Sequence, residues 1–266
     1  MNFYYSKKNS TDTILTKPTI IIQARTDSKR FPRKVLVKIE NKPMIWYSIE
    51  RVKKIRGIKQ VILATTKNSQ DKILLKIAKN CNILGFKGKT YDVLDRYYQC
   101  ALKFDADPII RITGDCPLID PVIIKKMLDQ FNKNNYDYIS NIFPPTFPDG
   151  LDVEIFSFKT LEKVIHKAKL SSDKEHVTSY IRNHPKEFKI FNYENTNDLS
   201  KLRWTVDEKQ DLVFIKRVYN RMKPKVNFSM KIILKIISKE PNILKINSKI
   251  SRNEGYVKSV KKDKSN

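Results

Sequence analysis

The sequence predicts an α/β protein built on a mostly parallel sheet with helices on both faces. Residues 19–24 and 60–65 are short, continuous apolar runs, which are typical of strands buried on both faces of a parallel sheet. Between these runs, apolar residues recur at the spacing of a helix. The chain then continues to alternate strand-like and helix-like segments, and strands separated by helices of about 10–15 residues favour a parallel sheet.

The first half of the chain gives these elements in a regular order. A helix is expected after Pro43, a favourable first-turn residue, because apolar side chains recur at helical spacing over 44–55. Asp120 and Pro121 predict the start of a later helix, since they supply an N-cap and a first-turn proline. The other elements expected here are strands at 82–86 and 108–113 and helices at 68–80 and 91–104.

The order changes after residue 140, where the proline-rich segment 141–150 predicts a loop. Residues 151–158 alternate apolar and polar side chains, which predicts a strand with one solvated face. The last residues, 241–266, are mostly polar and basic, so we treat them as a tail that need not be ordered. The remaining expected elements are strands at 188–193 and 202–206 and helices at 159–169, 173–184, 207–222 and 228–239.

The charge of the chain is strongly positive, with 53 Lys and Arg against 28 Asp and Glu and a net charge of +25. Such a balance would suit nucleic acid, an anionic membrane surface or a phosphorylated substrate. The excess is mostly Lys and is spread along the chain beside abundant Asn and Ile, so we attribute most of it to composition. A nucleic-acid partner is therefore not expected, and a non-catalytic nucleic-acid binder is kept only as a remote alternative.

The cysteines and the apolar runs indicate the compartment. Cys81, Cys100 and Cys116 form no CxxC spacing, which argues against a disulfide framework or a zinc site and for a reducing environment. No apolar run reaches signal-peptide or membrane-spanning length, so no membrane insertion is expected. We expect a cytoplasmic protein.

Ligands of open α/β sheets bind beyond the carboxyl ends of the strands, so the residues after each strand are the first candidates for a site. After the first strand comes a loop with Arg25, Ser28, Arg30, Arg33 and Lys34, which could aim several cations and a hydroxyl at one anion. Arg grips phosphate oxygens with two parallel bonds and Lys acts as a point charge. Neither a P-loop nor a GxGxxG motif is present, and a solvated basic turn remains the alternative.

Two carboxylates stand at comparable positions. Asp115 follows Gly114 at the end of the strand at 108–113, where the glycine would permit a tight turn. Asp207 follows the expected strand at 202–206. Magnesium prefers one or two carboxylates together with phosphate oxygens, so this pair with the basic loop is typical of a metal–nucleotide site. Asp115 as a turn former and Asp207 as a helix N-cap are the alternatives.

Six motifs carry a resemblance to a known family. The chain resembles the sugar cytidylyltransferases of the spore-coat polysaccharide biosynthesis protein F type, also described as acylneuraminate cytidylyltransferase-like, with CMP-Kdo and CMP-sialic acid synthetases as relatives. The resemblance covers about residues 19–222 in the family's order. The motifs are ARxxSxRxPxK at 24–34, GxxxDVLDRYY at 88–98, TGDCPLIDP at 113–121, PDGLDVEIF at 148–156, EHVT at 175–178 and RWTVD at 203–207.

The resemblance implies a nucleotide-diphospho-sugar transferase fold, of the GT-A or Rossmann-like kind. It also implies that CTP and a sugar, here expected to resemble a nonulosonic acid, give a CMP-sugar and pyrophosphate for a surface polysaccharide or glycan. Relatives are often dimers, which suggests a homodimer. The chain would divide into an N-terminal extension at 1–18, a nucleotidyltransferase domain at 19–240 with a sugar-binding part at about 141–200, and the basic tail at 241–266.

The resemblance also assigns roles to residues. Arg30, Lys34, Asp115 and Asp207 would be catalytic, and the two aspartates would hold Mg²⁺. The nucleotide-binding residues would be Ala24, Arg25, Ser28, Arg30, Lys34, Asp95 and Arg96, the last two bordering the nucleotide or the sugar. The residues facing the acceptor sugar would be Asp152, Glu154, Glu175 and His176.

Some alternatives stay open at this point. His176 could be a satisfied helix histidine, and acceptor and base selectivity are not readable from the residues. A sugar nucleotidyltransferase that uses another nucleotide, or a glycosyltransferase that consumes a nucleotide sugar, would fit the same fold. Relatives often have glycine where this chain has Arg33, so either the turn avoids a positive φ, or Arg33 adds a phosphate contact, or the loop is weakened.

Overall fold

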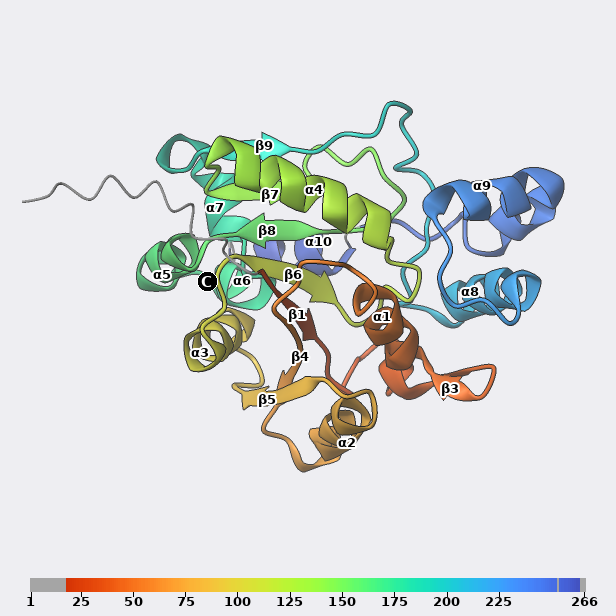
Figure 1. Cartoon of the computed structure of the whole chain (residues 1–266), viewed down its shortest axis with the longest axis horizontal. Helices are drawn as coiled ribbons and strands as arrows, with labels where there is room; N and C mark the ends of the chain where they lie inside the picture. Colours follow the sequence, from red (N-terminus) through yellow and green to blue (C-terminus); the bar gives the residue numbers. More distant parts are fainter. Residues whose placement is uncertain (1–17, 253, 264–266) are drawn as a thin grey trace, which may run out of the picture.

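The computed structural model describes residues 18–252 and 254–263, which form a mixed α/β fold (Figure 1). Within these residues the main sheet has seven strands in the order β5-β4-β1-β6-β8-β7-β9. The predicted α/β class and mostly parallel sheet with helices are confirmed. The strands are β1 (Thr19–Gln23), β4 (Gln60–Thr66), β5 (Leu84–Gly88), β6 (Ile109–Thr113), β7 (Tyr138–Ser140), β8 (Glu154–Phe156) and β9 (Ile190–Asn192), with a separate two-stranded ribbon of β2 (Lys38–Ile39) and β3 (Lys42–Pro43).

Strand direction places the ends of the first strands at one edge. Strand β1 pairs in parallel with both β4 and β6, so that Gln23 stands beside Ala64 and Thr113. Strand β5 extends the parallel part on the far side of β4. Strand β8 runs antiparallel to both β6 and β7, so the sheet reverses there. The loops that leave β1, β4 and β6 therefore meet at the same edge.

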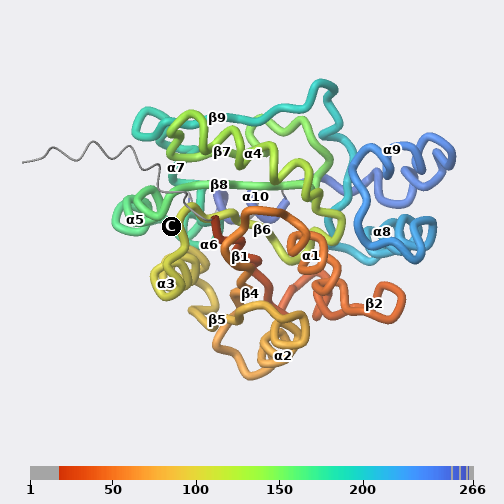
Figure 2. Tube along the Cα trace, viewed as in Figure 1, coloured from red at the N-terminus to blue at the C-terminus, as the bar shows by residue number. Residues whose placement is uncertain are grey.

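Helices cover both faces of the sheet, as Figures 1 and 2 show. Alternate residues of one strand belong to two different cores: Ile20 and Ile22 pack in one, and Ile21 packs in the other. The helices on the first face are α1 (Met44–Val52), α2 (Lys72–Asn80) and α4 (Pro121–Asn134); those of the second core are α3 (Val93–Phe104), α5 (Phe158–Lys167) and α7 (Ser179–Asn183), with α6 (Ser171–His176) against α3.

The C-terminal part adds helices beside the sheet. Helix α8 (Lys209–Met222) and helix α9 (Met230–Lys239) pack together and contribute to the first core (Figure 2). Short 3-10 helices join the larger elements: η1 (Lys34–Leu36), η2 (Ser69–Asp71), η3 (Pro185–Glu187) and η4 (Pro241–Ile246).

Several expected elements differ in the structure. Residues 202–206 are not a strand: residues 203–206 are buried, but their backbone bonds only to loop residues, with the Trp204 N–H donating to the Asp149 carbonyl at 2.6 Å. The helix expected at 173–184 is two short helices, because Val177 adopts a φ of 66° between them. Strand β7 was not predicted, since its three residues are too short to give a pattern.

The basic C-terminal segment is largely built into the fold. Ile243 and Asn247 are buried, and helix α10 (Glu254–Asp263) lies against α6 (Figure 2). The prediction that 241–266 is a tail that need not be ordered is therefore wrong for its first part, because the buried Ile243 and the hydrogen bonds of the Asn247 amide fix it. The expected extension at 1–18 lies, except for its last residue, outside the described residues.

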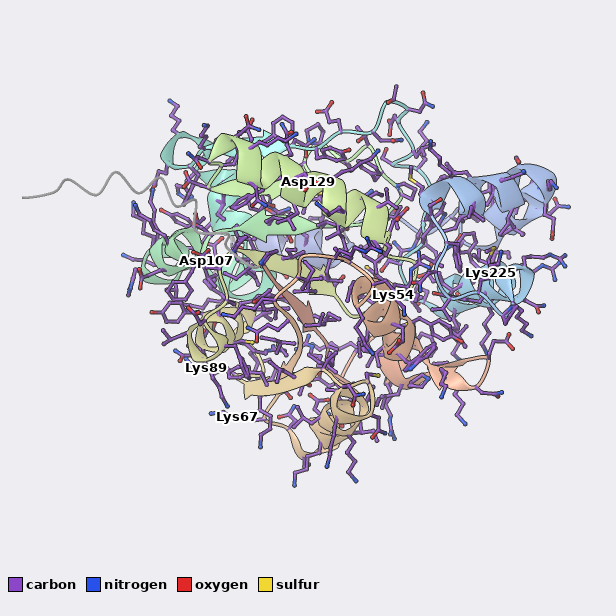
Figure 3. The ribbon with its side chains drawn as sticks, in the orientation of Figure 1. Lys54, Lys67, Lys89, Asp107, Asp129 and Lys225 are labelled. Carbon is purple, nitrogen blue, oxygen red and sulfur yellow. The ribbon has the colours of Figure 1, made fainter. Side chains whose placement is uncertain are left out.

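The surface carries its charge in a dispersed way. Figure 3 labels four lysines, on different parts of the molecule, together with two aspartates. Within the part of the chain that the structure describes, no helix has both the length and the apolarity to cross a bilayer.

Candidate active site

The two predicted carboxylates meet on one lysine. Lys34 Nζ donates to Asp115 Oδ2 at 2.7 Å and to Asp207 Oδ1 at 2.6 Å. These partners lie 81 and 173 positions away along the chain, and each arrives on a different element. The Lys34 side chain is only 10% exposed. The convergence expected from the order of strands is therefore present.

The loop after β1 is fixed by contacts that hold Lys34 in place. Arg33 has φ 57° and ψ 22°, the left-handed conformation, and its N–H donates to the Thr26 carbonyl at 2.9 Å. Thr26 in turn donates to Asp71 Oδ1 through its N–H at 2.8 Å and its hydroxyl at 2.6 Å. Asp71 also accepts from the hydroxyl of Thr66, at the end of β4. Asp71 was not predicted, although it ties the loop to the neighbouring strand.

Gly114 lies in a turn after β6 and also allows a close approach to the end of β1. Its φ is not positive, but an added Cβ would lie 2.9 Å from both the Gln23 carbonyl oxygen and Ala24 Cβ. Its N–H donates to the Gln23 carbonyl at 2.8 Å. Glycine therefore lets the end of β6 approach the end of β1, and this approach brings Asp115 next to the basic loop. The predicted turn is present, since the Cys116 N–H donates to the Thr113 carbonyl at 3.3 Å, but it does not depend on a positive φ at Gly114.

Asp207 is held by a network around Arg203. The Arg203 guanidinium donates to Asp149 Oδ2 at 2.8 Å, to Asp207 Oδ2 at 3.2 Å and to Asp211 Oδ1 at 2.9 Å. Asp211 also accepts the N–H groups of Asp207 and Glu208, each at 2.9 Å. Glu208 is the N-cap of α8. The Asp207 carboxylate is thus not used for capping, which removes that alternative.

Burial and charge oppose each other in this cluster. Burial alone would raise the pKa of Asp115, but the Lys34 ammonium outweighs it and lowers this pKa to about 2. Burial alone would lower the pKa of Lys34, whereas Asp115 and Asp207 together raise it. Asp115 and Lys34 are therefore ionised at neutral pH, which suits a site for an anionic nucleotide.

The other residues of the basic loop surround this cluster. Arg30 binds Asp207 Oδ2 at 2.8 Å and also approaches Glu208 and Glu254, at 3.7 Å and 3.5 Å. Arg25 is partly exposed and pairs with Asp27 at 3.2 Å. Ala24 is buried and donates its N–H to the Ala64 carbonyl at 3.1 Å, and Ser28 lies partly exposed in the same loop.

Asp95 and Arg96, the two site residues predicted on α3, differ in their surroundings. Asp95 lies in the first turn of this helix and pairs with Lys89 at 3.3 Å. Arg96 is buried, and its guanidinium donates to the carbonyls of Lys89 and Thr90 at 3.0 Å and 3.1 Å. Arg96 therefore shapes the segment between β5 and α3 and is not positioned to contact a ligand itself.

A cavity of about 230 Å³ lies between β6, β8, α6, α7 and α10. Three of the four predicted acceptor residues line it: Asp152, Glu154 and His176. Glu175 does not, since its carboxylate accepts from Ser259 at 2.7 Å. Arg111, Arg182 and Tyr256 also line this pocket and were not predicted.

Glu154 is a fixed part of the pocket wall. It is buried, forms an ion pair with Arg111, and accepts the hydroxyls of Tyr138, at 2.6 Å, and Thr178. Burial alone would raise its pKa, but Arg111 outweighs this and lowers it. His176 behaves in the opposite way, because burial lowers its pKa to about 4 and leaves its ring neutral at pH 7.

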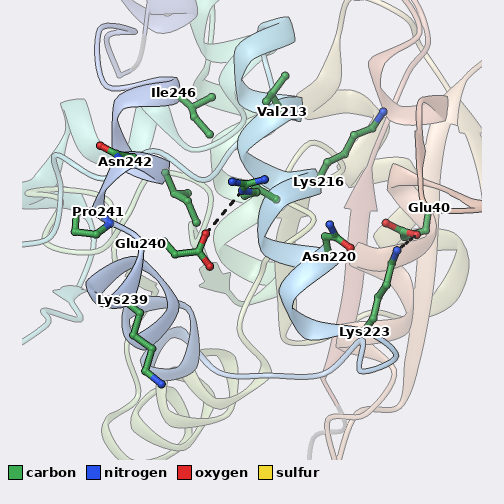
Figure 4. Close-up of a pocket in the computed structure, with 12 residues that line it drawn as sticks. Glu40, Val213, Lys216, Asn220, Lys223, Lys239, Glu240, Pro241, Asn242 and Ile246 are labelled. Carbon is green, nitrogen blue, oxygen red and sulfur yellow. Dashed lines mark ion pairs between the residues drawn. The ribbon is translucent and has the colours of Figure 1, made fainter.

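A larger cavity, of about 760 Å³, lies elsewhere. It lies along α8 and η4, with side chains from both, and Glu40 and Lys223 face each other at its rim (Figure 4). Neither Asp115 nor Asp207 lines it. We therefore assign the candidate site by the chemistry of the carboxylates and cations rather than by cavity size.

The carboxylate pair fits a magnesium ion held partly by a nucleotide. No group of three or more His, Cys, Asp or Glu side chains within residues 18–252 and 254–263 could hold a metal alone. Asp115 and Asp207 converge as a pair with oxygens that lie within hydrogen-bond distance of one ammonium. Two carboxylates with phosphate oxygens completing the shell is the ligand set that Mg²⁺ prefers.

The fold and this site define the class of α/β nucleotidyltransferases. A solved cytidylyltransferase from Leptospira borgpetersenii is 33% identical and superposes with a TM-score of 0.84 over 89% of this chain and 100% of that one. The cytidylyltransferase family matches residues 19–250, and the chain belongs to this family. The predicted nucleotide-diphospho-sugar transferase fold is thereby confirmed.

Two curated relatives show how the similarity is distributed. The spore coat polysaccharide biosynthesis protein SpsF of Bacillus subtilis is 28% identical over 84% of this chain and 94% of its own length. The 3-deoxy-manno-octulosonate cytidylyltransferase of Chloroherpeton thalassium is 35% identical over 44% of this chain and 47% of its own length. The resemblance to sugar cytidylyltransferases stated from the motifs is confirmed.

Proposed function

We propose that this protein transfers a cytidylyl group from CTP to a hydroxyl of an acidic sugar and releases pyrophosphate, for a surface polysaccharide or glycan. Membership of the cytidylyltransferase family supports the nucleotide. The names of the Bacillus and Chloroherpeton relatives support the sugar and the polysaccharide. The observation that carries the proposal is the meeting of Asp115 and Asp207 on Lys34, below the basic loop.

The chain's own residues would act through position and charge. The acceptor hydroxyl attacks the α-phosphorus in line, and negative charge grows on the phosphate oxygens and on the leaving pyrophosphate. Arg30 and Lys34 would compensate this charge, while Arg25 and Ser28 would bind phosphates at the rim. Lys34 would exchange its carboxylate partners for phosphate oxygens as the nucleotide enters, since both are anionic acceptors.

Asp115 and Asp207 would hold Mg²⁺ once Lys34 has moved to the phosphates. The ion would neutralise phosphate charge and help to orient the reacting groups. Arg203 would keep Asp207 in place through its bonds to Asp149 and Asp211. The supporting network is buried, so its geometry would be set before the ligand arrives.

The first test changes the carboxylates. Asp115→Asn and Asp207→Asn should each lower Mg²⁺-dependent pyrophosphate release by at least about a hundredfold, because the ligand charge is lost. Circular dichroism and thermal denaturation should show the fold retained. The matched control is Asp129→Asn on α4, which removes only an exposed ion pair with Lys125. Near-normal turnover of both site variants would overturn the metal assignment.

The substrates are tested by a screen of four nucleoside triphosphates against free sugars with Mg²⁺. Pyrophosphate from CTP and an acidic sugar is the expected result. Pyrophosphate released from another triphosphate would show that CTP is not the nucleotide substrate. Free nucleoside diphosphate released from a nucleotide sugar would indicate glycosyl transfer instead. Salt-dependent RNA or DNA binding without any turnover would favour the nucleic-acid alternative.

A further inference from the structure

The segment that follows the family match reaches into the acceptor pocket. The match to the cytidylyltransferase family ends at residue 250. Arg252, Glu254 and Tyr256 lie beyond it, and Tyr256 lines the cavity of about 230 Å³ together with Asp152, His176 and Arg182. One side of this pocket is therefore made by Tyr256, a residue outside the part that matches the family.

Tyr256 contacts two pocket side chains that each keep a buried polar atom without a hydrogen-bond partner. Its ring lies edge-on to His176 with centroids 5.1 Å apart, and the Arg182 guanidinium stands 5.0 Å from its centroid. Arg182 Nε and His176 Nε2 are buried and have no hydrogen-bond partner in the described part of the chain. Buried polar atoms without partners are costly, so these two atoms favour a polar ligand.

Arg252 pairs with a carboxylate that lines the pocket. Its guanidinium donates to Asp152 Oδ1 at 2.7 Å and to the Phe147 carbonyl at 2.9 Å. It also approaches Asp149 at 4.0 Å. With Arg252 in place, the Asp152 carboxylate is paired, and without it an unpaired carboxylate would face the ligand.

Charge counting then indicates the kind of group that the pocket accepts. Arg111 is paired with Glu154, and Asp152 is paired with Arg252. Arg182 forms no ion pair with a carboxylate among residues 18–252 and 254–263, so it leaves the pocket with one unbalanced cation. A pocket of this volume is below the roughly 300–1,000 Å³ of sites for drug-sized ligands, so it suits a single sugar unit.

We propose that Tyr256 and Arg252 determine acceptor specificity: the segment after residue 250 forms one wall of the acceptor pocket, and Tyr256 positions Arg182 for the anionic group of the sugar. The identity of the acceptor rests on the proposed function, whereas the position of Tyr256 in the pocket is observed in the structure. Two independent measurements separate these points.

The kinetic measurement uses CTP with glucuronate and 3-deoxy-manno-octulosonate as acids and glucose as a neutral sugar. We expect the KM for the acidic sugar to rise by about tenfold in three variants: Tyr256→Ala, Arg252→Ala and a chain ending at residue 250. The ratio of kcat/KM for the acid to kcat/KM for glucose should fall in the same variants. The KM for CTP should stay within about twofold. Asp129→Asn on α4, which lies outside the pocket and removes only an exposed ion pair, is the matched control and should behave as the wild type. Tyr256→Phe keeps the ring and should retain more of the preference for the acid than Tyr256→Ala. Unchanged acceptor KM values and an unchanged preference would overturn the proposal.

The second measurement needs no turnover. Diethylpyrocarbonate modifies neutral histidine, and mass spectrometry can follow His176 separately from the other two histidines. Modification of His176 should be slow in the wild type and in Tyr256→Phe, and clearly faster in Tyr256→Ala and in the chain ending at residue 250. Equal rates in all four proteins would show that no wall exists. If His176 is modified faster in Tyr256→Ala and in the chain ending at residue 250, but the wild type turns over none of the sugars, then Tyr256 does cover the pocket and the proposed function is rejected.

Discussion

Arg33 has a strained backbone conformation directly before the site residue Lys34. The turn does not avoid positive φ: Arg33 is left-handed at φ 57°, so this chain places a side chain where glycine would be unstrained. Its side chain is exposed. The strain lies one residue before Lys34, so it contributes to the direction in which Lys34 leaves the loop.

Arg33→Gly should therefore stabilise the protein. Removing the left-handed penalty of about 1–2 kcal/mol outweighs the roughly 0.5–1 kcal/mol entropic cost of glycine, which leaves a gain of about 0.5–1 kcal/mol. Chemical denaturation measures this difference. Arg33→Ala is the control, because it keeps the strained Cβ and should show no gain. If both variants also weaken CTP binding equally, Arg33 contributes a phosphate contact; equal stability of the two variants would reject the strain argument.

His176 should make the protein sensitive to mild acid. The unfolded chain binds a proton near pH 6.5, whereas burial and the nearby Arg111 and Arg182 lower the folded pKa to about 4, against the opposing effect of Glu175 and Glu154. Between these values the unfolded state binds more protons, so stability falls as the pH falls from 6.5 to 4.

His176→Gln tests this dependence. Over that pH range the wild type should lose about 2–3 kcal/mol of its free energy of unfolding through this group, and the variant should not show this part of the loss. Urea denaturation at several pH values measures both slopes. Equal slopes in the two proteins would show that folding does not lower the pKa of His176.

At the scale of elements, the sequence predicted most strands and helices because their patterns are local. The buried strand β1 and the helix that begins at Pro121 follow from apolar runs and from capping residues. The segment 202–206 carries the alternation of a strand and is buried like one, yet it has no neighbouring strand to pair with. The hydrophobic pattern of a segment predicts that one of its faces is buried. Whether the segment pairs with a strand depends on residues far away in the sequence.

The candidate site was predictable only in part for the same reason. Strand-end positions indicated Asp115 and the basic loop with Lys34, since parallel strands end at one edge. Asp207 was indicated from a strand at 202–206 that the structure does not have, and it reaches Lys34 from the buried segment before α8. The supporting contacts of Asp71 and Arg203 join residues that no local pattern relates, because their partners lie on other loops and helices. Tyr256 lies in a basic segment whose composition is typical of a solvated tail, so its place in a pocket had no signal in the sequence.

At the scale of the whole molecule, the site combines three parts of the chain. The parallel strands supply the basic loop and Asp115, the segment before α8 supplies Asp207, and the C-terminal segment supports both subsites. Asn247 donates to the Arg203 carbonyl at 3.0 Å and to Asp211 Oδ1 at 2.9 Å, so residues after 240 reach the network that holds Asp207. The homodimer and the cytoplasmic location stay predictions.

Truncation should reveal where the folded unit ends. A chain ending at residue 240 loses the buried Ile243, worth about 1.5–3 kcal/mol, and the Asn247 bonds, of which the one to the Asp211 carboxylate is worth about 1.5–3 kcal/mol. This loss is comparable to the typical 5–15 kcal/mol stability of a domain. A chain ending at residue 250 keeps both and should unfold within a few degrees of the full chain. Denaturation of the two truncated chains and of Asn247→Ala measures the boundary. If the chain ending at 240 is as stable as the one ending at 250 and turns over CTP normally, then residues 241–250 are a tail, and Asp207 is held without them.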